Sequence, residues 1–268
     1  MTDAYIYWVQ RLPKRFSQPL RTVEPIAGRH TVARLTDAEG KVWVGKVNEG
    51  NSNKHEVFVL ERLLKEVGCR EHVPEYLFDN EEPEILLTQK LDGSHVATEV
   101  MLNYLQPLLQ VLTDIHQTTA NLTEVMINYE SLFRELPRHP LRNWLEREAN
   151  KALVVQASAI TGFVHGDLVP QNLILNDEHW SLIDWEYSHY GDVRWDLASL
   201  AVEFGLTVEQ FYDVCRSYCL LINCDMDHFL SSAKLWLVIY IRICLGWSNT
   251  NNQPEDKYWL YLEMNLLN

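Results

Sequence analysis

Basic residues are scarce in this 268-residue sequence. It has 23 lysine and arginine residues against 37 aspartate and glutamate residues, which gives a formal net charge of −14. A chain this acidic repels nucleic acid and anionic membrane surfaces, so we expect neither as a partner. The charge fits a cationic partner or substrate, and it fits equally the acidity that is common among soluble proteins. Nothing in the sequence indicates an obligate protein partner.

The sequence also lacks a CxxC pair, and its five cysteines are an odd number. A secreted disulfide framework is therefore not expected, and reduced thiols in a cytosol are the simpler interpretation. Cys215, Cys219 and Cys224 raise the alternative of a metal site. However, the first two fit one face of an apolar helix, and no clean second half of a metal site appears.

A targeting signal and a membrane span are missing as well. The N-terminus has no basic start followed by an apolar core, which a signal peptide would have. The most apolar stretch, Leu235 to Leu245, is too short to cross a bilayer and contains Arg242. A cytoplasmic location is the expectation.

No internal repeat or low-complexity linker divides the chain, and its 47% apolar and 22% charged residues are typical of a globular protein. Residues 31–47 alternate around an acidic turn and predict a β-hairpin. Residues 53–67 carry an apolar stripe that ends at Val67 and predict a helix. Residues 84–91 predict a buried strand, which the following Asp-Gly pair ends.

The character of the sequence changes beyond residue 94, where helical periodicity dominates. Helices are predicted over 98–117, 141–159, 207–222 and 227–247. A β-like island of short extended runs interrupts them between Gly162 and Asp184. We therefore expect an α+β protein of two lobes, with a small β-rich lobe over 1–92 and a larger, mainly helical lobe over 93–268.

The β-like island contains the residues best suited to chemistry. Asp167 and Asn172 lie in the run HGDLVPQN, on a loop that Pro170 restrains, and Asp184 ends the next strand. A hairpin would return Asp184 beside Asn172, and such oxygen atoms are the ligands that Mg²⁺ takes together with substrate phosphates. Asp167 would remain available to accept a proton from a hydroxyl. Taken singly, Asp167 and Asn172 are more typical of a turn, but the three residues together favour the functional interpretation.

HGDLxxxN followed by IDWE resembles the aminoglycoside-phosphotransferase and choline-kinase superfamily, whose members are distant relatives of protein kinases. The continuation EYSHYGDVRWDLA over 186–198 strengthens the resemblance, because bacterial choline kinases and thiamine kinases carry a similar IDWEY run followed by DLA. The close match covers residues 163–200. The resemblance implies a two-lobed protein-kinase-like fold and an ATP- and Mg²⁺-dependent transfer of phosphate to an alcohol group.

The resemblance also implies a role for each residue of the motif. Asp167 corresponds to the catalytic aspartate that accepts or orients the hydroxyl proton, and Asn172 and Asp184 correspond to the Mg²⁺ ligands. His165 is expected to brace the loop by hydrogen bonds rather than to perform acid–base chemistry. Asp196 is expected to brace the same loop.

The N-terminal lobe should then hold the nucleotide. Lys46 lies on a strand after a hairpin, as the phosphate-pairing lysine of kinases does. Its carboxylate partner is Glu56 or Glu61 on the next helix, and Glu56 fits the family pattern better.

Two further nucleotide contacts are expected from backbone groups. The phosphate loop departs from the protein-kinase pattern, because residues 25–31 contain the single glycine Gly28 where protein kinases have three. Backbone amides near Gly28 are still expected to cover the phosphates. The hinge is expected over 88–92, with Gln89 and Leu91 meeting the purine.

The motif does not fix the acceptor. The candidate acceptor-binding residues are aromatic or acidic: Glu186, Trp185, Trp236, Tyr240 and Trp247. Aromatic faces bind quaternary ammonium groups through cation–π attraction. A choline- or thiamine-like amino alcohol is therefore the preferred acceptor.

Several alternatives remain open at this point. An aromatic stripe at helical spacing is usually core, and Glu186 has Arg194 and Arg242 as possible partners. Aminoglycosides are polycations that would suit the same acidity. A protein kinase is disfavoured by the short segment after Asp184, which leaves little room for a peptide platform. A non-catalytic nucleotide-binding relative would usually lack one of the motif residues.

Overall fold

The computed structural model of the protein describes residues 3–26, 31–47, 52–79, 85–118, 128–154 and 160–267. The chain divides into two compact units. The first consists of Met1–Ser94 with Ile174–Tyr187, and the second of His95–Leu173 with Ser188–Asn268.

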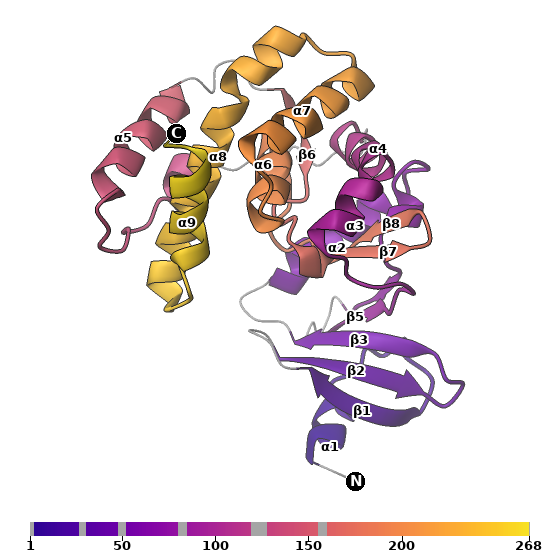
Figure 1. Ribbon diagram of the computed structural model, residues 1–268. Coiled ribbons are helices and arrows are strands. Elements are labelled where there is room, and N and C mark those ends of the chain that lie inside the picture. The colour runs from indigo at the N-terminus through magenta and orange to yellow at the C-terminus, as the bar shows by residue number, and fades with distance from the viewer. Residues whose placement is uncertain are drawn as a thin grey trace. The chain divides into compact units, whose positions relative to one another are not determined.

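The first unit is built on an antiparallel sheet with the strand order β1-β2-β3-β5-β4, and a hairpin of β7 and β8 joins it from later in the chain. Figure 1 shows β1, β2 and β3 side by side, as their pairing requires. The elements are α1 (Asp3–Val9), β1 (Leu20–Ile26), β2 (Val32–Asp37), β3 (Val42–Val47), α2 (Ser52–Leu63), η1 (Arg70–His72), β4 (Tyr76–Leu77), β5 (Ile85–Gln89), β7 (Leu173–Asn176) and β8 (His179–Leu182).

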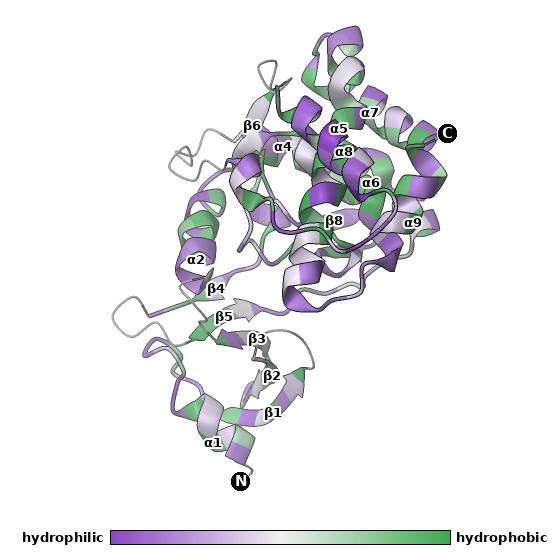
Figure 2. Cartoon of the chain, turned by 90° about the vertical axis from the view of Figure 1, so that its left-hand side faces the viewer, coloured by the Kyte–Doolittle hydropathy of each residue, from purple (hydrophilic) through white to green (hydrophobic). Residues whose placement is uncertain are grey.

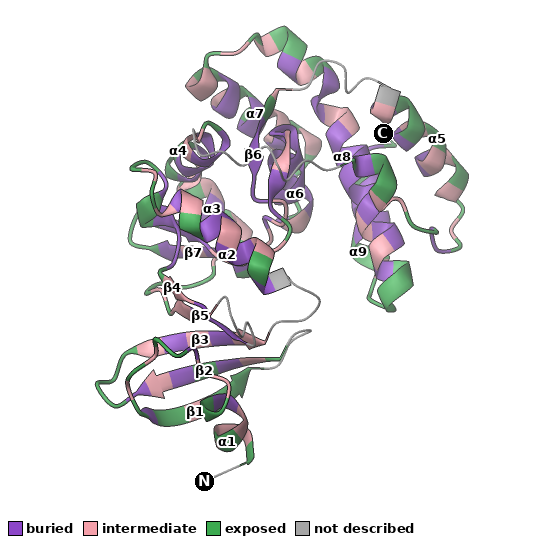
Figure 3. Cartoon of the chain, turned by 180° about the vertical axis from the view of Figure 1, so that it is seen from behind, coloured by how far each residue is buried: buried purple, intermediate pink, exposed green. Residues whose placement is uncertain are grey.

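The second unit is mostly helical. Figure 3 shows α8 buried along most of its length, and α8 packs against α5, α6, α7 and α9. The elements are α3 (Thr98–Asn103), α4 (Leu105–His116), η2 (Tyr129–Leu132), α5 (Arg142–Val154), β6 (Thr161–Val164), η4 (Pro170–Asn172), β9 (His189–Asp192), α6 (Arg194–Glu203), α7 (Val208–Ile222), α8 (Met226–Asn251) and α9 (Asp256–Asn265).

The predicted hairpin over 31–47 is confirmed as β2 and β3, in antiparallel register. Its turn is organised by Asp37, a buried carboxylate that accepts hydrogen bonds from the backbone N–H groups of Glu39 and Lys41 and from the indole of Trp43. Below the strands, Leu35 and Trp43 pack with other apolar side chains in one core. The predicted strand over 84–91 is likewise confirmed as β5, whose first three residues are buried.

The first unit differs from the predicted lobe over 1–92 because it also takes in residues 174–187. Hydrogen bonds to η1 hold this segment: His72 Nδ1 lies 2.8 Å from the Trp180 carbonyl oxygen, and His179 Nε2 lies 2.9 Å from the Glu71 carbonyl oxygen. Long-range pairing of this kind leaves no trace in local periodicity. Asp184 and Glu186 therefore belong to the same unit as Lys46.

Gly93 permits a close approach between two backbone segments of the first unit. Ser94 and Leu175 exchange backbone hydrogen bonds of 3.1 and 3.0 Å. Gly93 has φ +114°, and a Cβ atom there would lie 2.5 Å from the Leu175 carbonyl oxygen. The glycine at which the predicted strand stops is thus required by both backbone conformation and space.

Two predicted helices differ in extent from those observed. The helix predicted over 53–67 ends at Leu63, because the N–H groups of Lys65 and Glu66 bond to carbonyl oxygens three residues back, and Val67 is 94% exposed. The helix predicted over 98–117 is two helices, α3 and α4, that break at Tyr104. Pro107 accounts for the break, because it lacks an N–H to bond the carbonyl four residues earlier and its ring clashes with that group.

The apolar stretch from Leu235 to Leu245 lies inside the longer helix α8. Among the helices of the described residues, α8 is the one that is long and apolar enough to cross a membrane by length and composition, and 67% of its most apolar window is buried inside the protein. Such burial is expected of a helix at the centre of a helical unit.

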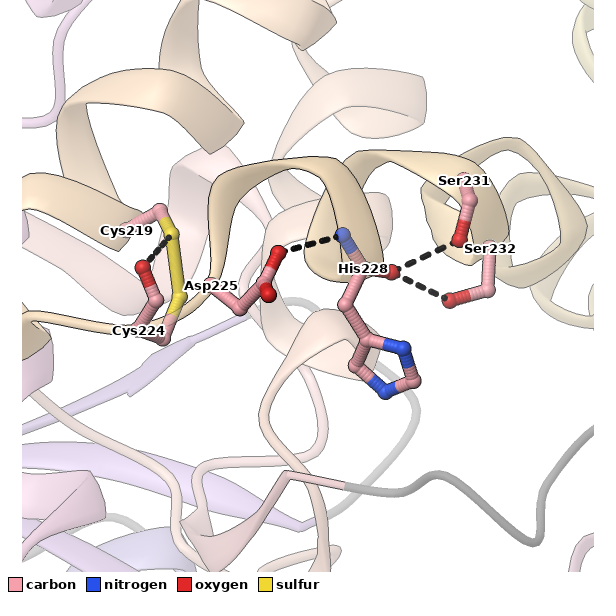
Figure 4. The surroundings of a disulfide bond; sticks show 6 residues. All are labelled: Cys219, Cys224, Asp225, His228, Ser231 and Ser232. Atoms are coloured by element: carbon pink, nitrogen blue, oxygen red, sulfur yellow. Dashed lines mark hydrogen bonds between the residues drawn. A yellow bond between two sulfur atoms is a disulfide. The ribbon is translucent and has the colours of Figure 1, made fainter.

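The expectation of five reduced thiols is wrong for one pair, because Cys219 and Cys224 form a disulfide (Figure 4). Asn223 ends α7 in the left-handed conformation and turns the chain back, which brings the two Cα atoms within 5.3 Å. Asp225 then starts α8 by accepting a hydrogen bond from the His228 N–H at 2.9 Å.

Candidate active site

In the first unit, the ammonium group of Lys46 on β3 binds three carboxylates. Its Nζ lies 2.7 Å from Asp184 Oδ1, 2.8 Å from Glu186 Oε2 and 3.3 Å from Glu56 Oε2. We call these four residues the Lys46 cluster. Three of its side chains are largely buried, and Asp184 is the most accessible at 36% exposure.

Glu56 reaches Lys46 because one face of α2 is directed at β3. Asn53, one helical turn earlier, donates from Nδ2 to the Lys46 carbonyl oxygen at 2.9 Å. Glu61, the alternative partner in the sequence, instead pairs with Lys65 at 3.0 Å on the exposed surface. The geometry therefore selects Glu56.

The charges of the Lys46 cluster are not balanced, because one ammonium faces three carboxylates. Burial alone would lower the pKa of Lys46, but the surrounding carboxylates outweigh it and hold the pKa above its ordinary value. Burial raises the pKa of Glu56 to about 7, and the attraction of Lys46 offsets this only in part. The cluster thus carries excess negative charge in a confined space.

Asp184 and Glu186 flank a sharp turn after β8. Asp184 has φ +64°, a conformation that Asp tolerates better than most residues. Between them, Trp185 is fully buried, and its indole donates to the Leu182 carbonyl oxygen at 3.2 Å. The indole fixes the turn, so both carboxylates are directed at Lys46.

The contacts of Glu186 and of the two arginines considered as its partners are as follows. Glu186 binds Lys46. Arg194 binds Asp192 within two residues, and the Arg242 guanidinium lies 4.6 Å from the centre of the Phe133 ring. The sequence carries no sign of the contact between Glu186 and Lys46, because the two residues are 140 positions apart.

In the second unit, Asp196 at the start of α6 holds the loop that follows β6. Its carboxylate accepts hydrogen bonds from the backbone N–H groups of His165 at 2.7 Å and Gly166 at 2.9 Å, and from His116 Nε2 at 3.0 Å. Gly166 has φ +87°, which favours glycine at this point. Burial would raise the pKa of Asp196, but these hydrogen bonds and the nearby imidazoles lower it.

Of two histidines at this loop, His165 was predicted from the sequence and His116 was not. The His165 ring accepts a hydrogen bond from the Asp167 N–H at 3.3 Å, so it lies where a bracing side chain would lie. His116 was not predicted. It stands at the end of a helix and is buried, with Nδ1 2.7 Å from the Tyr218 hydroxyl. Its only signal in the sequence is a lone histidine among apolar residues.

Asn172 fixes Asp167. It is buried in η4, and its Nδ2 donates to the Asp167 carbonyl oxygen at 2.9 Å and to the Asp167 carboxylate at 3.0 Å. Because the amide nitrogen is engaged on Asp167, the amide oxygen is the group that Asn172 can offer to a further ligand. We call residues 165–172 the catalytic loop, after the role that the sequence resemblance implies for Asp167.

Each unit by itself offers hard oxygen atoms, the kind of ligand that Mg²⁺ prefers. In the first unit, Asp184 offers the carboxylate oxygen that Lys46 does not bind, and in the second, Asn172 offers its amide oxygen. Within the described residues, no group of three or more His, Cys, Asp or Glu side chains is arranged to hold a metal ion.

The structure bears differently on the three residues whose backbone groups were expected to contact the nucleotide, Gln89, Leu91 and Gly28. The Gln89 N–H is used on the Glu75 carbonyl oxygen at 2.8 Å, and the next N–H, of Lys90, is used on Val42 at 3.0 Å. A contact from Gln89 to a purine would therefore come from its carbonyl group. Leu91 follows the end of β5, and Gly28 lies outside the described residues.

The predicted acceptor-binding aromatic residues are mostly buried. Trp185 and Trp236 have 0% and 3% exposure, and Trp236 packs edge-on against Tyr129. Their burial favours the core interpretation for these two. Tyr240 is also buried but has polar partners, and Trp247 is half-buried.

Tyr240 belongs to a buried polar cluster that the sequence did not predict as a unit. The hydroxyls of Tyr240 and Tyr258 donate to Glu203 Oε1 at 3.0 and 3.1 Å, and Lys257 Nζ lies 2.6 Å from Glu203 Oε2. We call these four residues the Glu203 cluster. Burial raises the pKa of Tyr240, and the nearby Cys244 and Glu203 add to the rise.

Comparisons with known proteins agree with this geometry. Protein LicA of Haemophilus influenzae is 28% identical over 155 residues, which cover 50% of this chain and 55% of that protein. The chain thus spans about half the length of the curated relatives it matches. Choline kinase LicA from Streptococcus pneumoniae superposes with a TM-score of 0.72 at 19% identity, covering 91% of this chain and 93% of that chain.

The fold is also shared with an antibiotic kinase. The GDP complex of aminoglycoside 2'-phosphotransferase-IIIa superposes with a TM-score of 0.70 at 16% identity, covering 97% of this chain and 96% of that chain. The two-lobed protein-kinase-like fold, with its α+β composition, is therefore established. Residues 22–228 match the model of the phosphotransferase enzyme family. This match includes both the Lys46 cluster and the catalytic loop, and the chain belongs to the phosphotransferase enzyme family.

Proposed function

We propose that the protein is an ATP- and Mg²⁺-dependent kinase that phosphorylates the hydroxyl of a small organic cation, with choline as the first candidate. The observation that carries the proposal is that the largely buried Glu203 side chain binds the ammonium group of Lys257 and accepts hydrogen bonds from Tyr240 and Tyr258. This carboxylate and Asp167, which Asn172 holds in place, belong to the same helical unit.

Nucleotide binding is assigned to the Lys46 cluster. Solved neighbours include LicA in complex with AMP and an amicoumacin kinase in complex with AMP-PNP and Ca²⁺. Lys46 is the cation of this chain that suits a phosphate, but the carboxylates around it would repel a triphosphate. Mg²⁺ would supply the missing positive charge, and Asp184 and Asn172 have the oxygen atoms to hold it.

Asp167 is assigned to the proton of the acceptor hydroxyl. As the acceptor oxygen forms its bond to the γ-phosphorus, the bond from that phosphorus to the β–γ bridging oxygen breaks, and the hydroxyl proton passes to the Asp167 carboxylate. Asn172 and the backbone contacts of Asp196 hold this carboxylate in place. The loop is thus built for positioning, which supplies most of the catalysis in phosphoryl transfer.

The Glu203 cluster is assigned to the cationic part of the acceptor. The Lys257 ammonium binds Glu203 and lies 4.6 Å from the centre of the Tyr258 ring, which shows that the cluster attracts a cation by charge and by an aromatic face. Lys257 is 57% exposed, so an incoming ammonium can replace it. A single buried carboxylate matches one cationic centre, which favours choline over a polycationic aminoglycoside.

A panel of acceptors tests the proposal. Purified protein with Mg²⁺-ATP is offered choline, ethanolamine, thiamine and kanamycin, and ADP release is measured. We expect turnover with choline, and a KM for choline that rises at least about tenfold in Glu203→Gln, because a charge-assisted contact is lost. Glu209→Gln, on the exposed start of α7, is the matched control. Turnover with kanamycin but not choline, or an unchanged KM in Glu203→Gln, would overturn the acceptor assignment.

A further inference from the structure

A pocket of about 560 Å³ lies in the first unit, away from the Lys46 cluster. Residues of α2 and β4 form most of its wall, and the lining consists of Arg15, Lys54, Val57, Phe58, Glu61, Tyr76, Leu77 and Phe78. Its volume is in the usual range for small-molecule sites. No step of the proposed reaction uses it.

The pocket uses a different stripe of α2 from the one that serves Lys46. Lys54, Val57 and Glu61 recur at helical spacing along the pocket. Asn53 and Glu56 share the other stripe, and both bind Lys46. Figure 2 shows hydrophilic and hydrophobic residues mixed along α2, as expected for a helix with two contact faces.

The lining of the pocket combines an apolar floor with cationic groups at its edge. Val57 and Phe78 are buried in one cluster, against which Tyr76 packs. Arg15 and Lys54 are exposed, and neither forms a hydrogen bond or ion pair with another described residue. The one carboxylate, Glu61, already binds Lys65. The pocket therefore has two cations to offer and no carboxylate that lacks a counter-ion.

We propose that this pocket binds a small aromatic anion, a ring-sized apolar body carrying one carboxylate or phosphate group, and that binding there strengthens nucleotide binding through α2. The ring packs on the floor made by Val57 and Phe78, and the anionic group meets Arg15 and Lys54. An occupant that joins α2 to β4 restrains the helix that presents Glu56 to Lys46. The effect on nucleotide rests on the proposed function, whereas the binding itself does not.

Binding is tested with 2-naphthoate and its neutral analogue 2-naphthamide, by calorimetry on the whole protein saturated with ADP and Mg²⁺. We expect 2-naphthoate to bind at least about tenfold more tightly than the amide, since a charged contact is lost. The double variant Arg15→Glu/Lys54→Glu is expected to bind 2-naphthoate at least about tenfold more weakly than the wild type does, for the same reason. Arg34→Glu, an exposed charge reversal on β2, is the matched control and is expected to bind as the wild type does.

The binding proposal is overturned if the acid and the amide bind equally, if 2-naphthoate does not bind at millimolar concentration, or if the double variant binds like the wild type. The comparison of the two ligands uses the wild-type protein, so it holds even if a variant folds poorly. Because binding is measured directly, it also stands apart from any failure to find a phosphate acceptor.

Coupling is tested by titrating nucleotide with and without saturating 2-naphthoate. We expect the nucleotide dissociation constant to fall about fivefold, and the 2-naphthoate constant to fall by the same factor when nucleotide is bound. In Glu56→Gln, 2-naphthoate is expected to bind as before while the coupling disappears. Unchanged nucleotide affinity in the wild type would overturn the role of α2. Absence of nucleotide binding altogether would instead overturn the proposed function.

Discussion

Two fully buried carboxylates in this protein have pKa values shifted in opposite directions. Glu56, in the first unit, has a pKa raised to about 7, whereas Asp196, in the second, has a pKa lowered from its usual value. Burial pushes both upward. The difference comes from their partners: Glu56 shares one ammonium with two other carboxylates, and Asp196 accepts two backbone hydrogen bonds and one from His116.

The comparison shows that donors, more than depth, decide the charge state of a buried acid. The Lys46 cluster is short of positive charge, which suits the proposed binding of Mg²⁺ together with a polyphosphate. The catalytic loop has its hydrogen bonds satisfied by the protein itself, which suits a place where position must not change. Four substitutions test this contrast, beginning with the largest expected effect.

Asp167→Asn removes the proton acceptor from the catalytic loop while leaving its shape. We expect turnover to fall by about 10²–10⁴-fold, because general-base catalysis contributes that much, while nucleotide affinity stays within about twofold. ADP release and calorimetry measure the two quantities. Asp177→Asn, at an exposed turn between β7 and β8, is the matched control. A fully active Asp167→Asn protein would show that the loop has no catalytic aspartate at this position.

Lys46→Met takes the only ammonium out of the Lys46 cluster. Two largely buried carboxylates, Glu56 and Glu186, then lose their counter-ion, and we expect a loss of about 3–5 kcal/mol of stability as well as of nucleotide binding. Adding Glu56→Gln to this variant should restore part of the stability, because one of the uncompensated charges is removed. Urea unfolding of the single and double variants measures this coupling. If the changes in unfolding free energy caused by the two substitutions simply added, Lys46 and Glu56 would not be coupled, which would contradict a shared shortage of positive charge.

Asp196→Asn leaves the size of the loop's central acceptor unchanged but removes its charge. We expect a smaller loss, about 1–3 kcal/mol, since one amide oxygen cannot replace a carboxylate that accepts from His165, Gly166 and His116 together. Turnover should fall along with stability because the loop positions Asp167. Asp213→Asn, at an exposed position on α7, is the matched control. Asp192 is unsuitable as a control because it binds Arg194. Equal stability of both variants would show that backbone contacts alone hold the loop.

The sequence could indicate that Asp167, Asn172 and Asp196 belong to one local arrangement because these residues are close together in the chain. Asp167, Asn172 and the brace Asp196 form a pattern that spans thirty positions, and local turns largely set their geometry. The sequence was silent on His116 and on the partner of Glu186, because both contacts join elements far apart in the chain. Helix α6 was also not predicted: nearly all its residues are buried, so it shows no polar face and no readable period.

Two of the aromatic residues that the sequence suggested for acceptor binding, Trp185 and Trp236, are buried in the structure. Trp185 and Trp236 share the helical or motif spacing of a binding surface, but side chains of this size are equally suited to filling a core, and the structure buries them. The Glu203 cluster could not be assembled from the sequence, since Tyr258 and Lys257 come from α9, a helix that was not predicted. Which aromatic residues face a cavity depends on packing, and periodicity alone does not determine packing.

Glu56→Gln has the smallest expected effect and tests the opening contrast most directly. Because the folded pKa of Glu56, about 7, lies above the ordinary glutamate value of 4.5, folding favours its protonated form. The resulting stability is present below pH 4.5 and is lost as pH rises through 7. We expect wild-type stability in urea to fall across that window by at most about 1.4 kcal/mol per pH unit, and Glu56→Gln to flatten the slope.

Asp196 should show the reverse dependence at the acid end. Its folded pKa lies below the ordinary aspartate value of 3.8, so its contribution to stability is present above pH 3.8 and is lost as pH falls through the folded pKa. Asp196→Asn should therefore flatten the acid limb and leave the window from pH 4.5 to 7 unchanged, while Glu56→Gln does the opposite. Glu61→Gln, exposed on the same helix as Glu56, controls for the loss of a carboxylate. If both variants changed stability over the same pH range, the hydrogen-bond donors of Glu56 and Asp196 would not account for a difference between the two acids. The charge shortage of the Lys46 cluster would then have to come from Asp184 and Glu186 alone.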